Sequence, residues 1–197
     1  MQTNSHTTSS ETISYSKLKS FLKLTKFTLS ALVVFSAIIT FFTVAENFNW
    51  KQVFAICVGG FLVTAAANGF NQIIEKDLDK LMHRTKLRPI PTGNLTVNQA
   101  LLFCGIFGVI GTVLLWVFTN PLCGIIGFAS IVLYALVYTP LKRVTPFSVF
   151  VGAIPGALPT LIGAIAATEG FGQITFFAVL LFCIQFFWQF PHFWAIA

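Results

Sequence analysis

Residues 52–74 read QVFAICVGGFLVTAAANGFNQII, and this run sets the class of the protein. It contains no charged side chain, and a membrane-spanning helix needs about 20 predominantly apolar residues. The sequence that follows, EKDLDKLMHRTKLRP at 75–89, holds three of the six acidic residues and five of the twelve basic ones. The chain therefore passes from an apolar medium to a charged interface near residue 74.

Similar charge-free runs make up most of the remaining chain. Of its 197 residues 56% are hydrophobic, and the mean hydropathy is +0.83, which is more apolar surface than a soluble domain of this length buries. The runs predict six spans: 27–45, 52–74, two within 89–141 that are divided near 119–121, 148–167 and 174–197. We therefore expect an all-α fold, a polytopic membrane helical bundle.

The basic residues are distributed unevenly among the predicted loops. Eleven of the twelve lie before the first span, between the second and third, or between the fourth and fifth, and Lys51 is the exception. The positive-inside rule places that side, and with it the N-terminus, in the cytoplasm. The net charge of +6 then reflects topology and does not indicate a nucleic-acid partner. We expect an integral protein of a bacterial inner membrane.

The end of the second predicted span has a geometry that topology does not require. At about 100° per residue, Asn68, Asn71, Glu75 and Asp79 fall within an arc of about 80°, whereas Asp77 falls on the other side. A solvated helix end with ordinary pairs four residues apart would explain Asp77 and its lysine neighbours. It explains the two asparagines poorly, because unpaired amides inside a span are costly.

The residue types on this arc indicate a particular ligand. Asn71, Glu75 and Asp79 offer oxygen ligands alone, and Mg²⁺ typically takes one or two carboxylates together with phosphate oxygens. Basic side chains suited to a diphosphate follow at alternate positions: Arg84, Lys86 and Arg88. Carboxylates and then cations at a membrane interface suggest a lipid with a diphosphate head group, whose tail lies among the apolar spans.

These residues carry a resemblance to a known family. Asn71-Gln72-x-x-Glu75-x-x-x-Asp79, followed by RTKLRPIPTG at 84–93, resembles the first aspartate-rich motif of the UbiA-type intramembrane prenyltransferases. Within that superfamily the pattern is similar to the protohaem IX farnesyltransferases (haem O synthases). Three further stretches agree with it: LTKFTLSALVVF at 24–35, YTPLKRVTPFSVFVGAIPGALPTLIG at 138–163 and FFWQFPHFWAIA at 186–197.

The resemblance implies transfer of a farnesyl group from farnesyl diphosphate to a vinyl group of haem B, with Mg²⁺ as cofactor. Asn71, Glu75 and Asp79 would hold the metal, and Arg84 and Arg88 would complete the catalytic set. The lipid bilayer, farnesyl diphosphate and haem B are then the expected partners. An association with haem A synthase or with assembly of a terminal oxidase is a further expectation.

Other polar positions are candidates for substrate binding. Tyr138, Lys142 and Arg143 lie where the fourth span leaves the membrane, and the two cations also serve the positive-inside rule. In related enzymes the corresponding cations assist the diphosphate, and Asn68 and Lys86 border the same motif. Gly152, Pro155, Gly156 and Pro159 in the fifth span indicate either close helix packing or a bent wall around a bulky ligand.

The sixth predicted span places Gln185, Gln189 and His192 on one narrow face. A satisfied network between helices would explain them, and so would a ligand site. A histidine suits haem iron or a propionate, so His192 inherits a haem-related role by resemblance.

Length separates the chain from the resembled family, whose members have nine spans and a second acidic motif. We expect a C-terminally truncated chain with a disordered polar tail over 1–20 and an incomplete prenyltransferase domain over 21–197, which alone would be inactive. A UbiA-type enzyme of quinone biosynthesis is the alternative function, and a small ion or solute transporter is the non-enzymatic one. The one-sided cations argue against the transporter.

Overall fold

A computed structural model describes residues 17–47 and 49–196, with side chains to Pro191. Within these residues the chain is helical and contains no strand, as predicted. The elements are α1 (Lys17–Leu24), α2 (Phe27–Val44), α3 (Trp50–Phe54), the π-helical segment η1 (Ala55–Gly59), α4 (Gly60–Ile74), α5 (Lys76–Leu81), α6 (Val97–Phe118), α7 (Pro121–Val132), the π-helical segment η2 (Leu133–Tyr138), α8 (Thr139–Leu141), α9 (Ser148–Ala166) and α10 (Phe176–Ile196).

The predicted spans correspond closely to these helices. Five helices of the described chain are long and apolar enough to cross a membrane: Phe27–Val44, Trp50–Ile74, Val97–Phe118, Pro121–Leu141 and Ser148–Ala166. α10 occupies the sixth predicted span, and its described apolar stretch, Phe176–Pro191, is shorter. The expectation of an all-α membrane bundle is confirmed.

The predicted boundary of the polar tail needs a correction. α1 begins at Lys17, so the last four residues of the predicted tail are helical, and Ser20 is buried. α1 packs against α4, which explains why this short polar helix forms next to the bundle. The first sixteen residues lie outside the described part of the chain.

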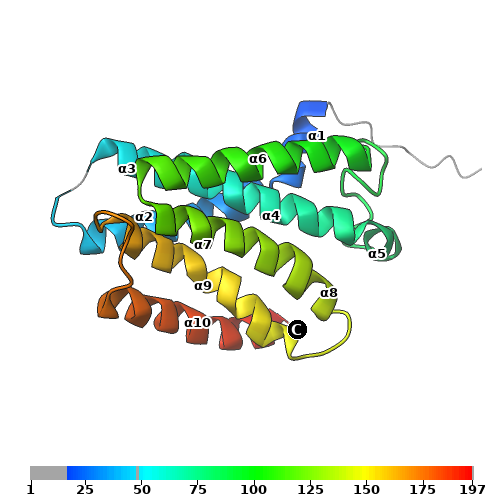
Figure 1. Cartoon of the computed structure of the whole chain (residues 1–197). Coiled ribbons are helices and arrows are strands. Elements are labelled where there is room, and N and C mark those ends of the chain that lie inside the picture. Colours follow the sequence, from blue (N-terminus) through cyan, green and yellow to red (C-terminus); the bar gives the residue numbers. More distant parts are fainter. Residues whose placement is uncertain (1–16, 48, 197) are drawn as a thin grey trace, which may run out of the picture.

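The bundle is built around α4, α2 and α9. α4 packs against α6, and α9 packs against both α2 and α10. The helices lie side by side along a common direction (Figure 1). Small residues permit these close approaches: a Cβ atom on Gly163 of α9 would collide with the backbone carbonyl of Ala37 on α2. The core between them is apolar, and it includes Phe41, Leu115 and Ile165.

Two ends of the bundle differ in chemistry. At one end Asn120 ties the start of α7 to the end of α9: its Oδ1 accepts from the Cys123 N–H at 3.0 Å, and its Nδ2 donates to the carbonyls of Ile165 and Thr168 at 2.8 and 3.3 Å. α5 and α8 both lie at the other end, and each packs against α4 (Figure 1). Charged side chains gather at this second end, among them Glu75, Asp79 and Lys142, so the candidate site lies here.

Candidate active site

The acidic end of α4 keeps its oxygen-bearing side chains on one buried face. α4 gives way to α5 around Glu75, where φ is −94° and ψ is 4°. The Glu75 N–H donates to the Asn71 carbonyl at 3.0 Å and the Asp79 N–H to the Glu75 carbonyl at 2.8 Å, so the four-residue spacing continues across this junction. Asn68, Asn71, Glu75 and Asp79 are 2, 2, 7 and 2% exposed.

Asn71 is oriented by hydrogen bonds from both hydrogens of its amide. Its Nδ2 donates to Glu75 Oε2 at 3.2 Å and to Thr139 Oγ1 at 2.9 Å. The Thr139 hydroxyl is fully buried and in turn donates to the Tyr134 carbonyl in η2 at 2.7 Å. Because the nitrogen is occupied in this way, Oδ1 is the atom of this amide that can bind a metal ion. Sequence reasoning missed Thr139, which contacts Asn71 only through the tertiary fold.

Each buried carboxylate of this face has a cationic partner. Lys142 Nζ lies 2.7 Å from Glu75 Oε1, and Arg88 Nη1 lies 2.9 and 2.7 Å from the two oxygens of Asp79. An unpaired charge at this depth would be strongly destabilising, so the ion pairs hold the two carboxylates in place. The loop that carries Arg88 is fixed by Thr85, whose hydroxyl donates to the Asp79 carbonyl at 3.1 Å.

Lys26 is a further charged group near the same face. It sits between α1 and α2 in the left-handed backbone conformation, with φ 48° and ψ 57°. Its pKa is lowered to about 8, first by burial and then by the positive charges of Arg88 and Lys142, while Glu75 and Asp79 oppose the shift. Sequence reasoning counted Lys26 only as a topological charge, although it lies inside the LTKFT stretch.

Three other cations of the loops are exposed to solvent. Arg84 and Lys86 are exposed in the loop between α5 and α6. Arg143 is also exposed, and its Nη2 donates to the Ile74 carbonyl at 2.9 Å, so that it caps the end of α4. Asp77 is likewise exposed, as predicted, and pairs with Lys80 at 3.9 Å.

A cavity of about 340 Å³ opens beside the buried face and extends into the bundle. Asn68 and Tyr138 line it, and Lys142 Nζ lies 5.5 Å from the centre of the Tyr138 ring. The wall on α9 consists of Gly152, Pro155, Gly156 and Pro159. Both expectations apply here: the four residues line the cavity, and Gly152 and Gly156 also permit close packing, because a Cβ atom on either would collide with Tyr138 or Gln189.

α10 supplies the amide groups of the opposite wall. Gln185, Trp188 and Gln189 line the cavity, and Gln189 Nε2 donates to the Ala153 carbonyl at 3.1 Å and the Gln185 carbonyl at 3.3 Å. Gln189 therefore belongs to an interhelical network and to the cavity at once. His192 follows on the same helix, and its side chain lies outside the described residues.

The buried face fits a hard divalent cation. Asn71, Glu75 and Asp79 provide amide and carboxylate oxygens on the buried face that Asn68 extends to the cavity, and this donor set suits Mg²⁺. No group of three or more His, Cys, Asp or Glu side chains gathers within the described chain. Mg²⁺ does not require one, because it keeps waters and phosphate oxygens as ligands beside one or two carboxylates.

Solved structures support the fold. A digeranylgeranylglyceryl phosphate synthase shares it with a TM-score of 0.75 at 23% identity, covering 86% of this chain and 58% of that one. A UbiA homologue from Archaeoglobus fulgidus, solved with DMAPP and Mg²⁺, matches with a TM-score of 0.70 at 16% identity, over 88% of this chain and 62% of that one.

Curated sequences are more similar. The protoheme IX farnesyltransferase of Christiangramia forsetii is 47% identical over 183 residues, which make up 93% of this chain and 60% of that protein. The mitochondrial protoheme IX farnesyltransferase of Arabidopsis thaliana is 44% identical over 141 residues, or 72% of this chain and 32% of that protein. The chain spans about 60% of the length of its bacterial relatives.

A family model covers nearly all of the described bundle. The model of the UbiA prenyltransferase family matches residues 31–197, from the first turns of α2 onward. The buried oxygen ligands, their cationic partners and the cavity all lie in or directly before this region. The chain belongs to the UbiA prenyltransferase family.

Proposed function

We propose that the chain takes part in transferring a farnesyl group from farnesyl diphosphate to a vinyl group of haem B, to form haem O. The observation that carries this proposal is the buried Asn71–Glu75–Asp79 face on the same side of the helix as Asn68, which lines a largely apolar cavity. The names of the curated relatives support the choice of haem as acceptor.

The charged cluster near the Asn68 and Tyr138 end of the cavity would bind the diphosphate. Asn71, Glu75 and Asp79 would hold Mg²⁺, which when bound neutralises charge on the diphosphate oxygens. Lys26, Arg88 and Lys142 lie around the same carboxylates, so they supply positive charge where the leaving diphosphate gains negative charge. The ion pairs with Asp79 and Glu75 hold Arg88 and Lys142 at this end of the bundle before the ligand binds.

The cavity would hold the farnesyl chain and protect the reacting carbon. The bond between the allylic carbon and the diphosphate oxygen breaks, and the π electrons of the vinyl group of haem B form a new bond to the allylic carbon. The cation left on the other vinyl carbon then adds water and releases a proton, while the diphosphate leaves with its bonding electron pair. An allylic cation reacts readily with water, so walls formed by Tyr134, Tyr138 and the α9 residues would limit water at this point. Gln185 and Gln189 would offer amides to a polar group of the acceptor.

The remaining candidate residues have secondary parts in this proposal. Arg84 and Lys86, both exposed, would meet the diphosphate as it approaches from water. Arg143 would maintain the end of α4, and Asn68 the inner boundary of the polar face. A haem contact of His192 stays a prediction from the resemblance.

The cellular setting is also a proposal. The cations at one end of the bundle favour a cytoplasmic N-terminus in a bacterial inner membrane. An association with haem A synthase or with terminal oxidase assembly would follow from the product. It rests on the resemblance alone.

Labelled farnesyl diphosphate tests the proposal. Membranes that contain the chain are incubated with it, haem B and Mg²⁺, and label is expected in the haem fraction. Binding of the same compound to the purified chain, with and without Mg²⁺, separates loss of the site from loss of transfer. Label in a quinone precursor would select the alternative enzyme, and the absence of Mg²⁺-dependent binding would refute the site.

A further inference from the structure

The turn that joins α1 to α2 is tied to α4 at two points. Gln72 Nε2 donates to the carbonyl of Leu24, the last residue of α1, at 2.8 Å. Asn68, one turn earlier on α4, donates from Nδ2 to Ser30 Oγ at 3.4 Å, and Ser30 Oγ donates to the carbonyl of Thr25 at 2.8 Å. Both amide side chains are buried, since Gln72 is 1% exposed and Asn68 2%. The position of this turn is therefore set by α4, the helix that carries the buried acidic face.

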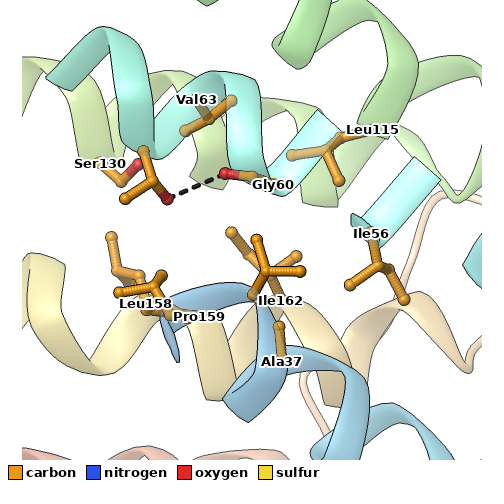
Figure 2. Close-up of a pocket in the computed structure, with 12 residues that line it drawn as sticks. Ala37, Ile56, Gly60, Val63, Leu115, Ser130, Leu158, Pro159 and Ile162 are labelled. Carbon is orange, nitrogen blue, oxygen red and sulfur yellow. Dashed lines mark hydrogen bonds between the residues drawn. The ribbon is translucent and has the colours of Figure 1, made fainter. Parts of the chain in front are cut away.

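Gln72 makes this contact in spite of an unfavourable environment. Its Oε1 is buried and has no hydrogen-bond partner among the described residues, and a buried acceptor without a partner is destabilising. A polar side chain nearer the middle of α4 avoids this: the Thr64 hydroxyl donates to the Gly60 carbonyl of its own helix at 2.8 Å, beside an apolar core cavity of about 30 Å³ (Figure 2). An apolar side chain at position 72 would leave no acceptor unpaired. Core stability therefore does not explain Gln72, whereas its bond to Leu24 does.

The turn that Gln72 holds carries Lys26. Lys26 adopts the left-handed conformation, with φ 48° and ψ 57°, which is strained for a lysine and which a glycine adopts freely. A requirement of the backbone alone would favour glycine here, so the side chain is the reason for a lysine. Its ammonium interacts electrostatically with the buried carboxylates Glu75 and Asp79 and with their cationic partners. Lys26 therefore belongs to the charged cluster that would bind the diphosphate.

We infer that Gln72 is a positioning residue, which holds the Leu24 carbonyl so that Lys26 places its ammonium at the diphosphate site. This inference rests on the proposed function, since it assumes a diphosphate at the charged cluster. Lys26 lies only two residues after Leu24, so a shift of that carbonyl displaces the lysine as well. Loss of the Gln72 amide would free the α1 side of the turn, and the strained Lys26 backbone would then relax away from the site.

A double-mutant cycle with Lys26 tests the inference. Gln72→Met keeps the length of the side chain and removes the donor, and Lys26→Met removes the ammonium. The probe is the unreactive thiolodiphosphate analogue of farnesyl diphosphate, whose binding to the purified chain is measured with Mg²⁺. Each single variant is expected to bind it about tenfold more weakly than the unsubstituted chain, and the double variant no more weakly than Lys26→Met. A residue that acts through Lys26 has no further effect once the ammonium is absent.

Two further variants complete the cycle. Gln52→Met is the matched control: Gln52 Nε2 donates to the Ala166 carbonyl at 3.1 Å, so it also joins two helices by an amide–carbonyl bond, but at the end of α9 remote from the charged cluster. It should leave the affinity unchanged with or without Lys26. Ser30→Ala removes the second tie of the turn and serves as an independent variant where Gln72→Met folds poorly. It is expected to weaken binding in the chain with Lys26 and to have no effect in the Lys26→Met background.

The outcomes separate the positioning role from the proposed function. If Gln72→Met weakens binding equally with and without Lys26, the positioning role is wrong, and a higher Mg²⁺ requirement in both backgrounds would identify Gln72 as a metal ligand instead. The role is also wrong if Gln72→Met binds as tightly as the unsubstituted chain, or if Gln52→Met weakens binding as much, while the diphosphate site stands. If the unsubstituted chain shows no Mg²⁺-dependent binding of the analogue, the proposed function itself fails, and the positioning role fails with it.

Discussion

At the scale of single residues, charge pairing distinguishes the acids that face the site from those that face water. Asp79 is 2% exposed and bonded to Arg88, whereas the side chain of Asp77, two positions earlier, is 78% exposed. Both lie in the same charged stretch, so this pair provides a direct comparison. The difference follows from the helical period, which turns every fourth residue toward the bundle.

Replacing Asp79 should therefore weaken the site while replacing Asp77 should not. Asp79→Asn removes a ligand charge and leaves Arg88 without its partner, so Mg²⁺-dependent binding of farnesyl diphosphate is expected to weaken at least about tenfold. Asp77→Asn is the control, and a retention assay on the purified chain measures both. Equal affinities in the two variants would contradict the assignment of the buried face.

Thr139 should act as a positioning residue for Asn71. Thr139→Val keeps the shape but removes the hydroxyl that accepts from Asn71, so the amide loses its fixed orientation. The Mg²⁺ concentration needed for half-maximal binding should rise about tenfold, and Thr139→Ser should restore it. Thr40→Val, at another buried threonine whose hydroxyl bonds to its own helix, is the control. A similar rise in that control would reveal a general packing effect.

Lys26 predicts a pH dependence of diphosphate binding. Its pKa is lowered from 10.5 to about 8, so its ammonium charge is present below that pH and is lost as the pH rises through it. Affinity for the anionic ligand should fall over this range. Lys26→Arg keeps its charge throughout, because the arginine pKa is above about 12, and its binding should decline less. Parallel pH profiles for the two proteins would argue against Lys26 as a contributor.

At the scale of elements, the joins between helices position the site. α4 and α5 continue the four-residue bonding pattern across Glu75, while η2 brings Thr139 and the following Lys142 to the same end of the bundle. A π-helical segment changes the phase of a helix and is frequent at functional sites. Hydrophobic runs predict where a span lies, but they do not reveal such a phase change. This is why the sequence did not predict the Asn71–Thr139 contact.

Close packing between α2 and α9 should be sensitive to a single methyl group. Gly163→Ala would place a Cβ atom against the backbone of Ala37, which cannot move aside as a flexible side chain can. We expect a loss of about 1–3 kcal/mol in the free energy of unfolding, compared by thermal unfolding in detergent with Gly105→Ala. An unchanged midpoint for Gly163→Ala would show that the helices separate at little cost.

At the scale of the whole molecule, composition predicts the helical membrane bundle, whereas the fold determines which cations pair with the buried carboxylates. Spans of about twenty apolar residues are visible directly in the sequence, so the bundle and its boundaries were predictable. Arg88 lies close enough in sequence to Asp79 for the pair to be anticipated. Lys142 and Lys26 approach the carboxylates from other parts of the chain, and no local pattern predicts that approach.

Topology can be tested directly on the whole chain. A reporter active only in the cytoplasm, inserted in the loop between α5 and α6, is expected to be active, since that loop lies at the end rich in lysine and arginine. The same reporter between α9 and α10 should be silent. The reverse pattern would invert the proposed orientation and place the charged end of the cavity on the outer side.

The internal ion pairs of Glu75 with Lys142 and Asp79 with Arg88 have a consequence for how a ligand enters. Each carboxylate already has a cationic partner, so binding of the metal and the diphosphate would exchange these partners. A divalent cation would bind the carboxylates, and the released Lys142 ammonium and Arg88 guanidinium would bind the phosphates. The number of contacts between opposite charges would stay nearly the same. The site would gain little net charge, because the charges of the divalent cation and the diphosphate nearly cancel. A metal ion alone would leave the two released cations without a partner, and a diphosphate alone would leave the two carboxylates without one. Each ligand should therefore bind weakly without the other.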